Sequence, residues 1–496
     1  MNRILSLVSA MSLLSLPLAA HSQQSPGDWF EEGRAAVERN LALRAAEGAT
    51  AKNVILFVGD GMGVSTVTAA RILEGQLRGE TGEENELFFE NFPNLALAKT
   101  YNTDAQVPDS AGTMTAMVTG VKTRAGLISV SDAALRGDCA SQQGAELLTF
   151  LEIAEMRGLA TGVVSTARLT HATPASNYAH IMERNFESDA DAAGLSDPGD
   201  CVDVARQLIE FTDNVEGSDG LEVALGGGRG AFLPDRDGTD PEDGGPGRRI
   251  DGRDLTREWV ERHENAAYIW NAEQFAAIDP EKASHLLGLF DWSHMEYELD
   301  RETDAAGEPS LSEMTAKAIE MLSRNPNGYY LNIEGARIDH AHHDINPIRA
   351  LTDTIEFAHA VRTAYEMVDL SETLIIVTAD HSHVFTVAGY PGRGNPILGI
   401  VAGGDGEPDL AADGMPYTTL GYINGPNPGR DEDLGHVDTT HESFRSQTLV
   451  PLGSETHAGE DVAVYAVGPG ADLVRGVIEQ NVIFHIMMEA TRLDQR

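Results

Sequence analysis

Long runs of apolar residues, each ending in a group of polar residues, recur along this chain. The runs are "NVILFVG", "GLATGVVSTA", "YYLNIEG", "TLIIVTA" and "DVAVYAVG". Apolar runs without polar alternation are typical of strands buried on both faces, and several are followed by apolar residues at helical spacing. Strands that alternate with helices predict an α/β fold with a central, mostly parallel sheet covered by helices on both faces.

The polar groups follow the predicted strands directly. They contain Asp60, His171, Thr173, Glu334, Asp339, His343, Asp380 and His381. In an open α/β sheet, ligands bind at the carboxyl ends of the strands. We therefore expect these side chains to converge on one site.

Three segments interrupt the alternation of strands and helices. Residues 233–254 are rich in Gly, Asp, Pro and Arg, residues 291–309 are acidic and irregular, and both are predicted to be long loops. Residues 386–450 are rich in Gly and Pro with short β signals, and are predicted to form an inserted subdomain. The core of the fold would then comprise residues 51–385 and 451–496.

The N-terminus reads "MNRILSLVSAMSLLSLPLAAHSQQ". A basic residue, a short apolar run and the small residues Ala19, Ala20 and Ser22 predict a signal peptide over 1–22, and hence a periplasmic or secreted protein. An amphipathic N-terminal helix is the alternative. A helical arm is expected in 23–50, and no later segment is long and apolar enough to span a bilayer.

Acidic residues dominate the composition. Asp and Glu number 78 against 35 Lys and Arg in 496 residues, a formal net charge of −43. This balance argues against nucleic-acid binding through a basic surface and is typical of the solvated acidic surface of salt-adapted proteins. An anionic substrate would need a strongly positive local site. The two cysteines, Cys139 and Cys201, predict one disulfide in an exported protein, which leaves carboxylates and imidazoles as metal ligands.

The stretch "VPDSAGTMTAMVTG" places Ser110 at the start of a predicted helix. Taken alone, the pattern favours a helix cap, because Asp and Ser are preferred there. The alternative is that Ser110 is a nucleophile, which only the other polar groups could support.

Several polar residues have spacings that suit metal binding. Asp339 and His343 are four residues apart, so on a helix they share one face and could both bind Zn²⁺; an exposed polar helix start is the alternative. Asp380 and His381 can reach one ion only because their strand has ended. Asp60 could bind the same ion or cap the helix that follows it.

Other polar residues are ambiguous by themselves. Glu334 and Thr173 offer the hard oxygen ligands that Mg²⁺ prefers. His171 is more often a hydrogen-bonding residue than a ligand, and His457 is ambiguous. Arg184 could bind a phosphate through two nitrogens or form a surface ion pair.

Together these motifs resemble a known family. "FVGDGMG", "VPDSAGT", "HATPAS", "EGARIDHAHH", "TADHSHVF" and "ETHAGEDVAV" are similar to alkaline phosphatase, in its animal-like bacterial branch, from about residue 27 to about residue 490. The resemblance implies a three-layer sandwich with an inserted crown-like subdomain. It also implies a homodimer that hydrolyses small phosphate monoesters of broad structure, with an alkaline optimum.

The resemblance assigns roles to individual residues. Ser110, preceded by Asp109, would be the nucleophile that becomes phosphoserine, and Arg184 would bind the phosphate oxygens. His171 and His340, which match the animal-type pattern, would lie just outside the metal ligands.

Metal ligands follow from the same resemblance. Two Zn²⁺ and one Mg²⁺ would be bound, the first zinc ion by Asp339, His343 and His457, the second by Asp60, Asp380 and His381, and magnesium by Asp60, Thr173 and Glu334. A peripheral Ca²⁺ site would take Glu242, Phe290 through its carbonyl, Asp291 and Glu308. The ions would also supply the local positive charge that an anionic substrate needs in so acidic a protein.

Two other classes of function compete with this interpretation. A phosphodiesterase or sulfatase of the same superfamily would use Thr, Cys or a modified Ser in a different local motif, and Ser110 between Asp109 and Ala111 argues against both. The other rival is an acidic secreted protein that binds metal, for example calcium, or adheres to a surface, without catalysis.

Overall fold

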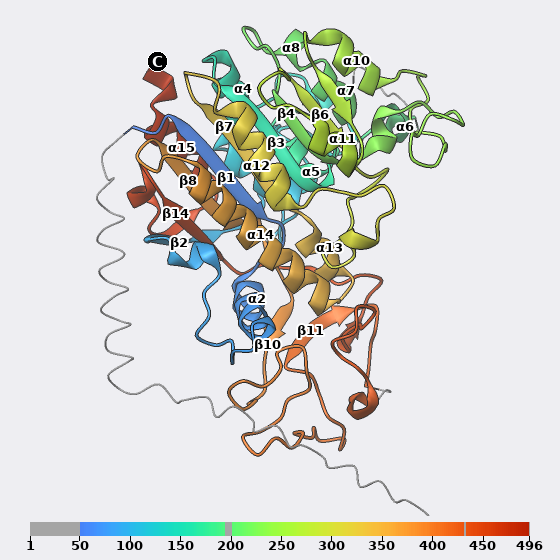
Figure 1. Ribbon diagram of the computed structural model, residues 1–496, viewed down its shortest axis with the longest axis vertical. Coiled ribbons are helices and arrows are strands. Elements are labelled where there is room, and N and C mark those ends of the chain that lie inside the picture. The colour runs from blue at the N-terminus through green and yellow to red at the C-terminus, as the bar shows by residue number, and fades with distance from the viewer. Residues whose placement is uncertain (1–49, 194–200, 431–432, 496) are drawn as a thin grey trace, which may run out of the picture. The chain divides into compact units, whose positions relative to one another are not determined.

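A ten-stranded sheet runs through the structure, a computed structural model that describes residues 50–193, 201–430 and 433–495 (Figure 1). The expected signal peptide and all but the last residue of the expected helical arm lie outside these residues. In sheet order the strands are β15 (Gly476–Glu479), β2 (Asn94–Lys99), β14 (Val462–Val467), β8 (Thr373–Ala379), β1 (Asn53–Gly59), β7 (Tyr329–Gly335), β3 (Ala160–Arg168), β4 (Val223–Gly227), β6 (Leu286–Leu289) and β5 (Ala267–Ile269).

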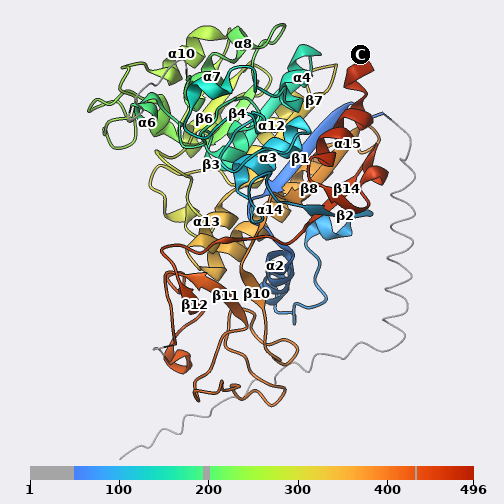
Figure 2. The same cartoon turned by 180° about the vertical axis from the view of Figure 1, so that it is seen from behind.

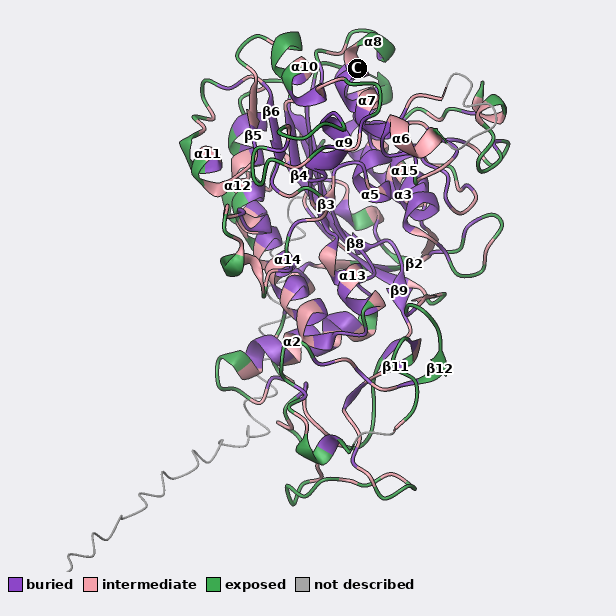
Figure 3. Ribbon diagram, turned by 90° about the vertical axis from the view of Figure 1, so that its right-hand side faces the viewer, coloured by how far each residue is buried: buried purple, intermediate pink, exposed green. Residues whose placement is uncertain are grey.

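All neighbouring strands of this sheet pair in parallel except at β14. That strand runs antiparallel to β2 on one side and to β8 on the other. The prediction of a mostly parallel sheet is therefore confirmed. The central strands are buried along their whole length, as their apolar composition requires, and in Figure 3 the strands of the sheet are largely buried.

Helices cover both faces of the sheet, as expected for an α/β sandwich. The long helices α12 and α14 lie over one face (Figure 1), and α3 and α15 lie over the other (Figure 2). The helices are α2 (Val64–Leu77), α3 (Ser110–Thr119), α4 (Phe150–Met156), α5 (Ala172–Ala175), α6 (Asp189–Ala192), α7 (Val204–Ile209), α8 (Phe211–Asn214), α9 (Arg229–Phe232), α10 (Leu255–Arg262), α11 (Ala272–Ala277), α12 (Leu311–Leu322), α13 (Arg337–His343), α14 (Pro347–Met367) and α15 (Val482–Thr491). Within the described ranges, none of them is long and apolar enough to cross a membrane.

The segment expected as an inserted subdomain contains a small sheet of its own. Its three strands are β10 (Phe385–Val387), β11 (Leu420–Gly425) and β12 (Thr448–Pro451). A two-stranded ladder of β9 (Ser382–His383) and β13 (His457–Ala458) connects the ends of this segment. Long exposed loops join these strands (Figure 3).

Candidate active site

Adjacent parallel strands bring three carboxylates to one edge of the sheet. The strands β8, β1 and β7 are neighbours, and because they are parallel their carboxyl ends lie at the same edge. Asp380 follows β8, Asp60 follows β1, and Glu334 occupies β7 one residue before its end. All three side chains are fully buried. Ionised groups are rarely buried in this way unless they are paired or bind a metal.

The hydroxyl of Ser110 lies at the start of α3 and faces two of these polar residues. Its Oγ is 3.1 Å from Nε2 of His381 and 3.4 and 3.5 Å from the carboxylate oxygens of Asp60. The cap of α3 is Asp109, whose carboxylate accepts a hydrogen bond from the backbone N–H of Gly112. Because Asp109 performs the capping, the hydroxyl of Ser110 is left to face the buried polar site.

A first group of potential metal ligands gathers around α13. One carboxylate oxygen of Asp339 is 3.4 Å from Nε2 of both His343 and His457, and these two nitrogens are 3.1 Å apart. Their Nδ1 atoms lie 2.6 and 2.8 Å from the backbone carbonyls of Glu455 and Pro108. A carbonyl oxygen only accepts, so each ring carries its proton on Nδ1 and leaves Nε2 free for an ion.

A second group adjoins Ser110. Asp60, Asp380 and His381 offer ligand atoms that lie within 4.8 Å of one another. Nε2 of His381 is 3.4 Å from Asp60 and 3.2 Å from Asp380, and the backbone N–H of Gly61 donates to Asp380 at 3.0 Å. An imidazole with two carboxylates at this spacing is a donor set that fits Zn²⁺.

A third group shares Asp60 and adds Glu334 and His171. The hydroxyl of Ser165 donates to one oxygen of Glu334, whereas the other oxygen is buried without a hydrogen-bond partner. The hydroxyl of Thr173 is buried in the same unpartnered state. Unpartnered buried oxygens are costly, and an ion that prefers oxygen ligands, such as Mg²⁺, would satisfy them.

The pKa values of these residues also fit bound cations. Burial, with the charge of Asp380, raises the pKa of Asp60 well above its ordinary value. Burial raises the pKa of Glu334 to about 8 and also raises the pKa of Asp380. Burial, with the charge of His457, lowers the pKa of His381 well below its usual value. The carboxylates are thus costly to ionise and the imidazole keeps its lone pair, so each group is stabilised by a cation.

The guanidinium of Arg184 contacts Asp109, the residue before Ser110. It donates to Asp109 at 3.0 Å and lies 3.1 Å from Nε2 of His171. Burial acts to lower the pKa of Arg184, but the carboxylate of Asp109 outweighs it and holds the pKa above its ordinary value. A permanently charged planar group in this position can bind two oxygens of a phosphate.

Two residues that adjoin the first group, His383 and Glu455, were not singled out from the sequence. Nε2 of His383 is 2.7 Å from Asp339, and its Nδ1 is 2.6 Å from the carboxylate of Glu455. Burial opposes a charge on His383, but the two carboxylates raise its pKa to about 10. Both residues stand in recognised motifs, "TADHSHVF" and "ETHAGEDV", two residues after His381 and two before His457. Their presence in these motifs was the available signal.

Three imidazoles lie close together, and one of them, His171, contacts Arg184. The ring of His340 is 5.5 Å from that of His171 and 4.1 Å from that of His294, a residue that the sequence did not reveal. Burial lowers the pKa of His340 to about 3 and that of His171 well below its usual range, so both rings are neutral. Of the two, only His171 belongs to a group of potential metal ligands among the described residues.

The four positions matched to a calcium site are only partly assembled. Glu242 forms an ion pair with Arg229. Glu308 is buried with one oxygen lacking a partner, and burial, with the charge of Asp291, raises its pKa to about 8. The carbonyl of Asp291 accepts from the backbone of Arg229 at 3.0 Å. Phe290, the fourth position, is buried directly before Asp291 in the chain.

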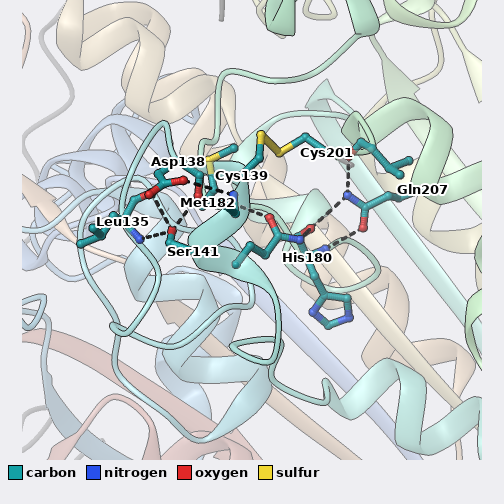
Figure 4. Close-up of a disulfide and its surroundings, with 11 residues drawn as sticks. Leu135, Asp138, Cys139, Ser141, His180, Met182, Cys201 and Gln207 are labelled. Atoms are coloured by element: carbon teal, nitrogen blue, oxygen red, sulfur yellow. Dashed lines mark hydrogen bonds between the residues drawn. A yellow bond between two sulfur atoms is a disulfide. The ribbon is translucent and has the colours of Figure 1, made fainter. Parts of the chain in front are cut away.

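The two cysteines form the disulfide that the sequence predicts. The Cα atoms of Cys139 and Cys201 are 5.6 Å apart (Figure 4). Nearby, the side chain of Gln207 accepts from the backbone N–H of His180 at 2.8 Å. The disulfide joins the segment that precedes β3 to the segment that follows Arg184.

Phosphoryl transfer depends on positioning and on cancelling charge more than on covalent chemistry by the protein. A serine hydroxyl, adjoining candidate cation sites and a half-buried guanidinium at the carboxyl edge of a parallel sheet supply both. The fold and site therefore define a metal-dependent phosphohydrolase.

Comparison with known proteins identifies the family. The sequence profile of alkaline phosphatase matches residues 51–493, and this chain belongs to that family. It is 43% identical over 483 residues to the alkaline phosphatase of Gadus morhua, covering 95% of this chain and 98% of that protein. It is 44% identical over 489 residues to the tissue-nonspecific isozyme of Gallus gallus, covering 96% and 92%. The protein is accordingly a phosphoric monoester hydrolase.

Solved structures support the fold. The alkaline phosphatase of Thermus thermophilus superposes with a TM-score of 0.64 at 24% identity, covering 90% of this chain and 92% of that one. The enzyme from the Antarctic bacterium TAB5 gives 0.59 at 23% identity, covering 90% and 98%.

Proposed function

We propose that the enzyme hydrolyses phosphate monoesters of broad structure through a phosphoserine intermediate at Ser110. The observation that carries this proposal is the position of its Oγ, 3.1 Å from His381 and 3.4 Å from Asp60. A serine hydroxyl is a weak nucleophile unless its ionised form is stabilised. Both neighbours belong to one group of potential metal ligands, so the hydroxyl lies beside a candidate cation site.

We assign two Zn²⁺ and one Mg²⁺ to the three groups. The ligands are Asp339, His343 and His457 for the first zinc ion, Asp60, Asp380 and His381 for the second, and Asp60, Thr173 and Glu334 for magnesium, with His171 and His340 just outside. Bound ions would supply positive charge that lowers the pKa of the hydroxyl and stabilises the phosphoryl group. The unpartnered oxygens of Glu334 and Thr173 support the magnesium assignment.

Side chains of the protein position the reacting groups. Asp109 fixes both the start of α3 and the guanidinium of Arg184, which would bind two phosphate oxygens. The N-terminus of α3 favours negative charge at Ser110. Attack by Oγ forms the phosphoserine and releases the alcohol, and water then cleaves the phosphoserine in a second displacement at the same place.

Three further proposals concern the whole protein. Signal-like residues 1–22 and the disulfide support export to the periplasm or the medium. His171 and His340, which match the animal-type pattern, support the animal-like branch of the family. The net charge of −43 supports adaptation to salt.

A calcium ion and a second subunit complete the proposal. The unpartnered buried oxygen of Glu308, beside Asp291, supports Ca²⁺ binding there, with Phe290 and Glu242 as the other expected ligands. The proposal of a homodimer rests on the resemblance to the family.

A comparison of three substrates tests the proposal. Nitrophenyl phosphate should be turned over faster than bis-nitrophenyl phosphate and nitrophenyl sulfate. A preference for the diester or the sulfate would favour a related phosphodiesterase or sulfatase. An absence of phosphate release from the metal-loaded protein would favour a protein that binds metal without catalysis. Metal analysis of the purified protein, with activity measured after chelation and after adding Zn²⁺ and Mg²⁺ back, tests the ion assignments.

A further inference from the structure

Glu455 is buried beside the first group of metal ligands, and all its polar atoms are engaged. Its side chain is fully buried. One carboxylate oxygen accepts from Nδ1 of His383 at 2.6 Å and the other from the backbone N–H of Val384 at 2.8 Å. Its backbone N–H donates to the carbonyl of His343 at 3.1 Å, and its own carbonyl accepts from Nδ1 of that ring at 2.6 Å.

These contacts orient two residues of the first zinc group. The carbonyl of Glu455 holds the proton of His343 on Nδ1, which turns Nε2 towards Asp339 and His457. The carboxylate of Glu455 holds His383, and the other nitrogen of His383 holds Asp339 at 2.7 Å. Glu455 therefore acts on His343 directly and on Asp339 through one intermediate ring.

Glu455 is badly placed to bind the ion itself. It lies within reach of His343 and His383, which could suggest a separate metal site. Both rings, however, face Glu455 with Nδ1, and both Nδ1 atoms are already committed to its oxygens. The nitrogen that faces the zinc group is Nε2, on the opposite side of the His343 ring. Glu455 is therefore placed to orient the ligand residues from the side opposite to the ion.

The segment that carries Glu455 is fastened to the inserted subdomain. The backbone N–H of Thr456 donates to the side chain of Asn424 in β11 at 3.0 Å, and the amide of Asn424 donates back to the hydroxyl of Thr456 at 3.0 Å. The backbone N–H of Leu452 also donates to Gly425 at 3.0 Å. The position of Glu455 is thus set by β11.

The subdomain also holds the end of the zinc-binding helix. Ile345, just after α13, is fully buried and has φ of 49°, a conformation that is a marked outlier for a β-branched residue. Its carbonyl accepts from the backbone N–H of Ser446 at 3.0 Å, and its side chain lies against Gly425. Such strain persists only where the surroundings impose it. Two separate contacts therefore connect the subdomain to α13.

We propose that Glu455 is a positioning residue that links the inserted subdomain to the first zinc site. The proposal rests on the proposed ligands Asp339, His343 and His457. Loss of the Glu455 carboxylate releases His383 and the backbone N–H of Val384. The ring of His383 then no longer holds the carboxylate of Asp339 in a fixed orientation. Zinc then binds more weakly at this site.

Glu455→Ala tests this link, with Glu152→Ala as the matched control. Glu152 is also buried, with one carboxylate oxygen 2.8 Å from Nε2 of His180 and the other 2.8 Å from a backbone N–H, but it contacts none of the proposed zinc ligands. We expect Glu455→Ala to weaken zinc binding at one site about 10–100-fold in competition with a chromogenic chelator. Both variants should lower the melting temperature, whereas Glu152→Ala should bind zinc as the unmodified enzyme does.

Activity provides a second measurement. At limiting zinc, Glu455→Ala should lose kcat with little change in KM, and excess zinc should restore it. Glu455→Gln keeps the size and one acceptor, so its loss should be smaller. Unchanged zinc affinity, an equal loss in Glu152→Ala, or a loss of activity that zinc does not restore would each overturn the proposal. Failure of both Glu455 variants to fold in excess zinc, with Glu152→Ala folded, would also count against it.

His343→Ala separates this inference from the ligand assignment. If that variant keeps both zinc ions at unchanged affinity, the assigned ligands are wrong. If it loses one ion while the Glu455 variants bind zinc normally, only the role of Glu455 is wrong.

Discussion

The carboxylate of Asp109 caps α3 and also binds the guanidinium of Arg184, with 3.0 Å between the two side chains. Ser110 is the next residue in the chain. A single side chain therefore sets the position of the proposed nucleophile relative to the proposed phosphate-binding group. Asp109 could be taken for an ordinary helix cap. Because it also holds Arg184, it connects two groups of the proposed active site.

Replacement of Arg184 should impair phosphate binding. We expect Arg184→Ala to lower kcat/KM about 10²–10³-fold, because a preorganised charge facing the phosphoryl group is lost. Arg184→Lys should recover little, since an ammonium cannot bridge two oxygens. Inhibition by inorganic phosphate should weaken in parallel. Arg136→Ala, which breaks an exposed ion pair with Glu183, is the control. Unchanged phosphate inhibition in Arg184→Ala would contradict the assignment.

Replacement of Ser110 should abolish turnover without removing the ions. Ser110→Ala is expected to lose at least about a thousandfold in kcat, as for other covalent nucleophiles. Its zinc content should stay the same, because the proposed ligands are intact. Labelled phosphate should be trapped on the unmodified enzyme by acid quenching and be absent from the variant. Ser176→Ala, another buried serine, is the control. Labelling that survives in Ser110→Ala would identify a different nucleophile.

Removal of the metals should make stability depend on pH. In the metal-free protein the pKa of Glu334 is raised to about 8, and the pKa values of Asp60 and Asp380 are also raised. Between the ordinary carboxyl value and about 8, the folded chain holds protons that the unfolded chain has lost, so stability falls as pH rises. Thermal melts of chelated enzyme from pH 5 to pH 8 should show this fall.

The metal-loaded enzyme provides the comparison for that experiment. Bound cations stabilise the ionised carboxylates, so its melting temperature should not fall across the same range. Adding zinc to the metal-free enzyme near pH 7 should release protons. A melting temperature of the metal-free enzyme that rises with pH would contradict this account.

Removal of the disulfide should lower the stability of the protein and leave its activity largely unchanged. The bond between Cys139 and Cys201 closes a loop of 62 residues, for which chain entropy gives about 4 kcal/mol. Cys139→Ser with Cys201→Ser should lower the free energy of unfolding by that order, measured by denaturant titration. None of the proposed catalytic groups contacts the disulfide, so kcat at 25 °C should be retained. A large loss of kcat at unchanged stability would show that the bond supports the site directly.

Salt should stabilise the protein. With a net charge of −43, repulsion between surface carboxylates opposes the folded state, and salt screens it. Melting temperature and activity should both rise from low salt towards molar NaCl. A steady fall in both would contradict salt adaptation.

The sequence predicted the elements that carry long apolar runs. Strands β1, β3, β7, β8 and β14 correspond to such runs, and four of them form the centre of the sheet on the two sides of β1. The shorter strands β4, β5 and β6 have only three to five residues, too few for a pattern to distinguish them from loops. The antiparallel direction of β14 is set by pairing with distant strands, which no local pattern contains.

The candidate site was also predictable only where its residues adjoin long apolar strands. Asp60, Glu334 and Asp380 could be found because they lie at the carboxyl ends of apolar strands. Glu455 had only its place in the motif "ETHAGEDV" to mark it and His294 had no signal, because the importance of each depends on what the fold places next to it. Glu455 lies in a short connection and His294 in an irregular acidic loop, and neither has a periodic pattern around it.

The placement of β14 has a consequence for biosynthesis. This strand, together with His457 just before it, comes from the last tenth of the chain, yet it lies between β2 and β8 in the sheet. Until this late segment has been made and has paired, the edges of β2 and β8 stay open and the first group of potential metal ligands lacks His457. The candidate active site therefore cannot be complete in a partly synthesised chain that has not reached β14.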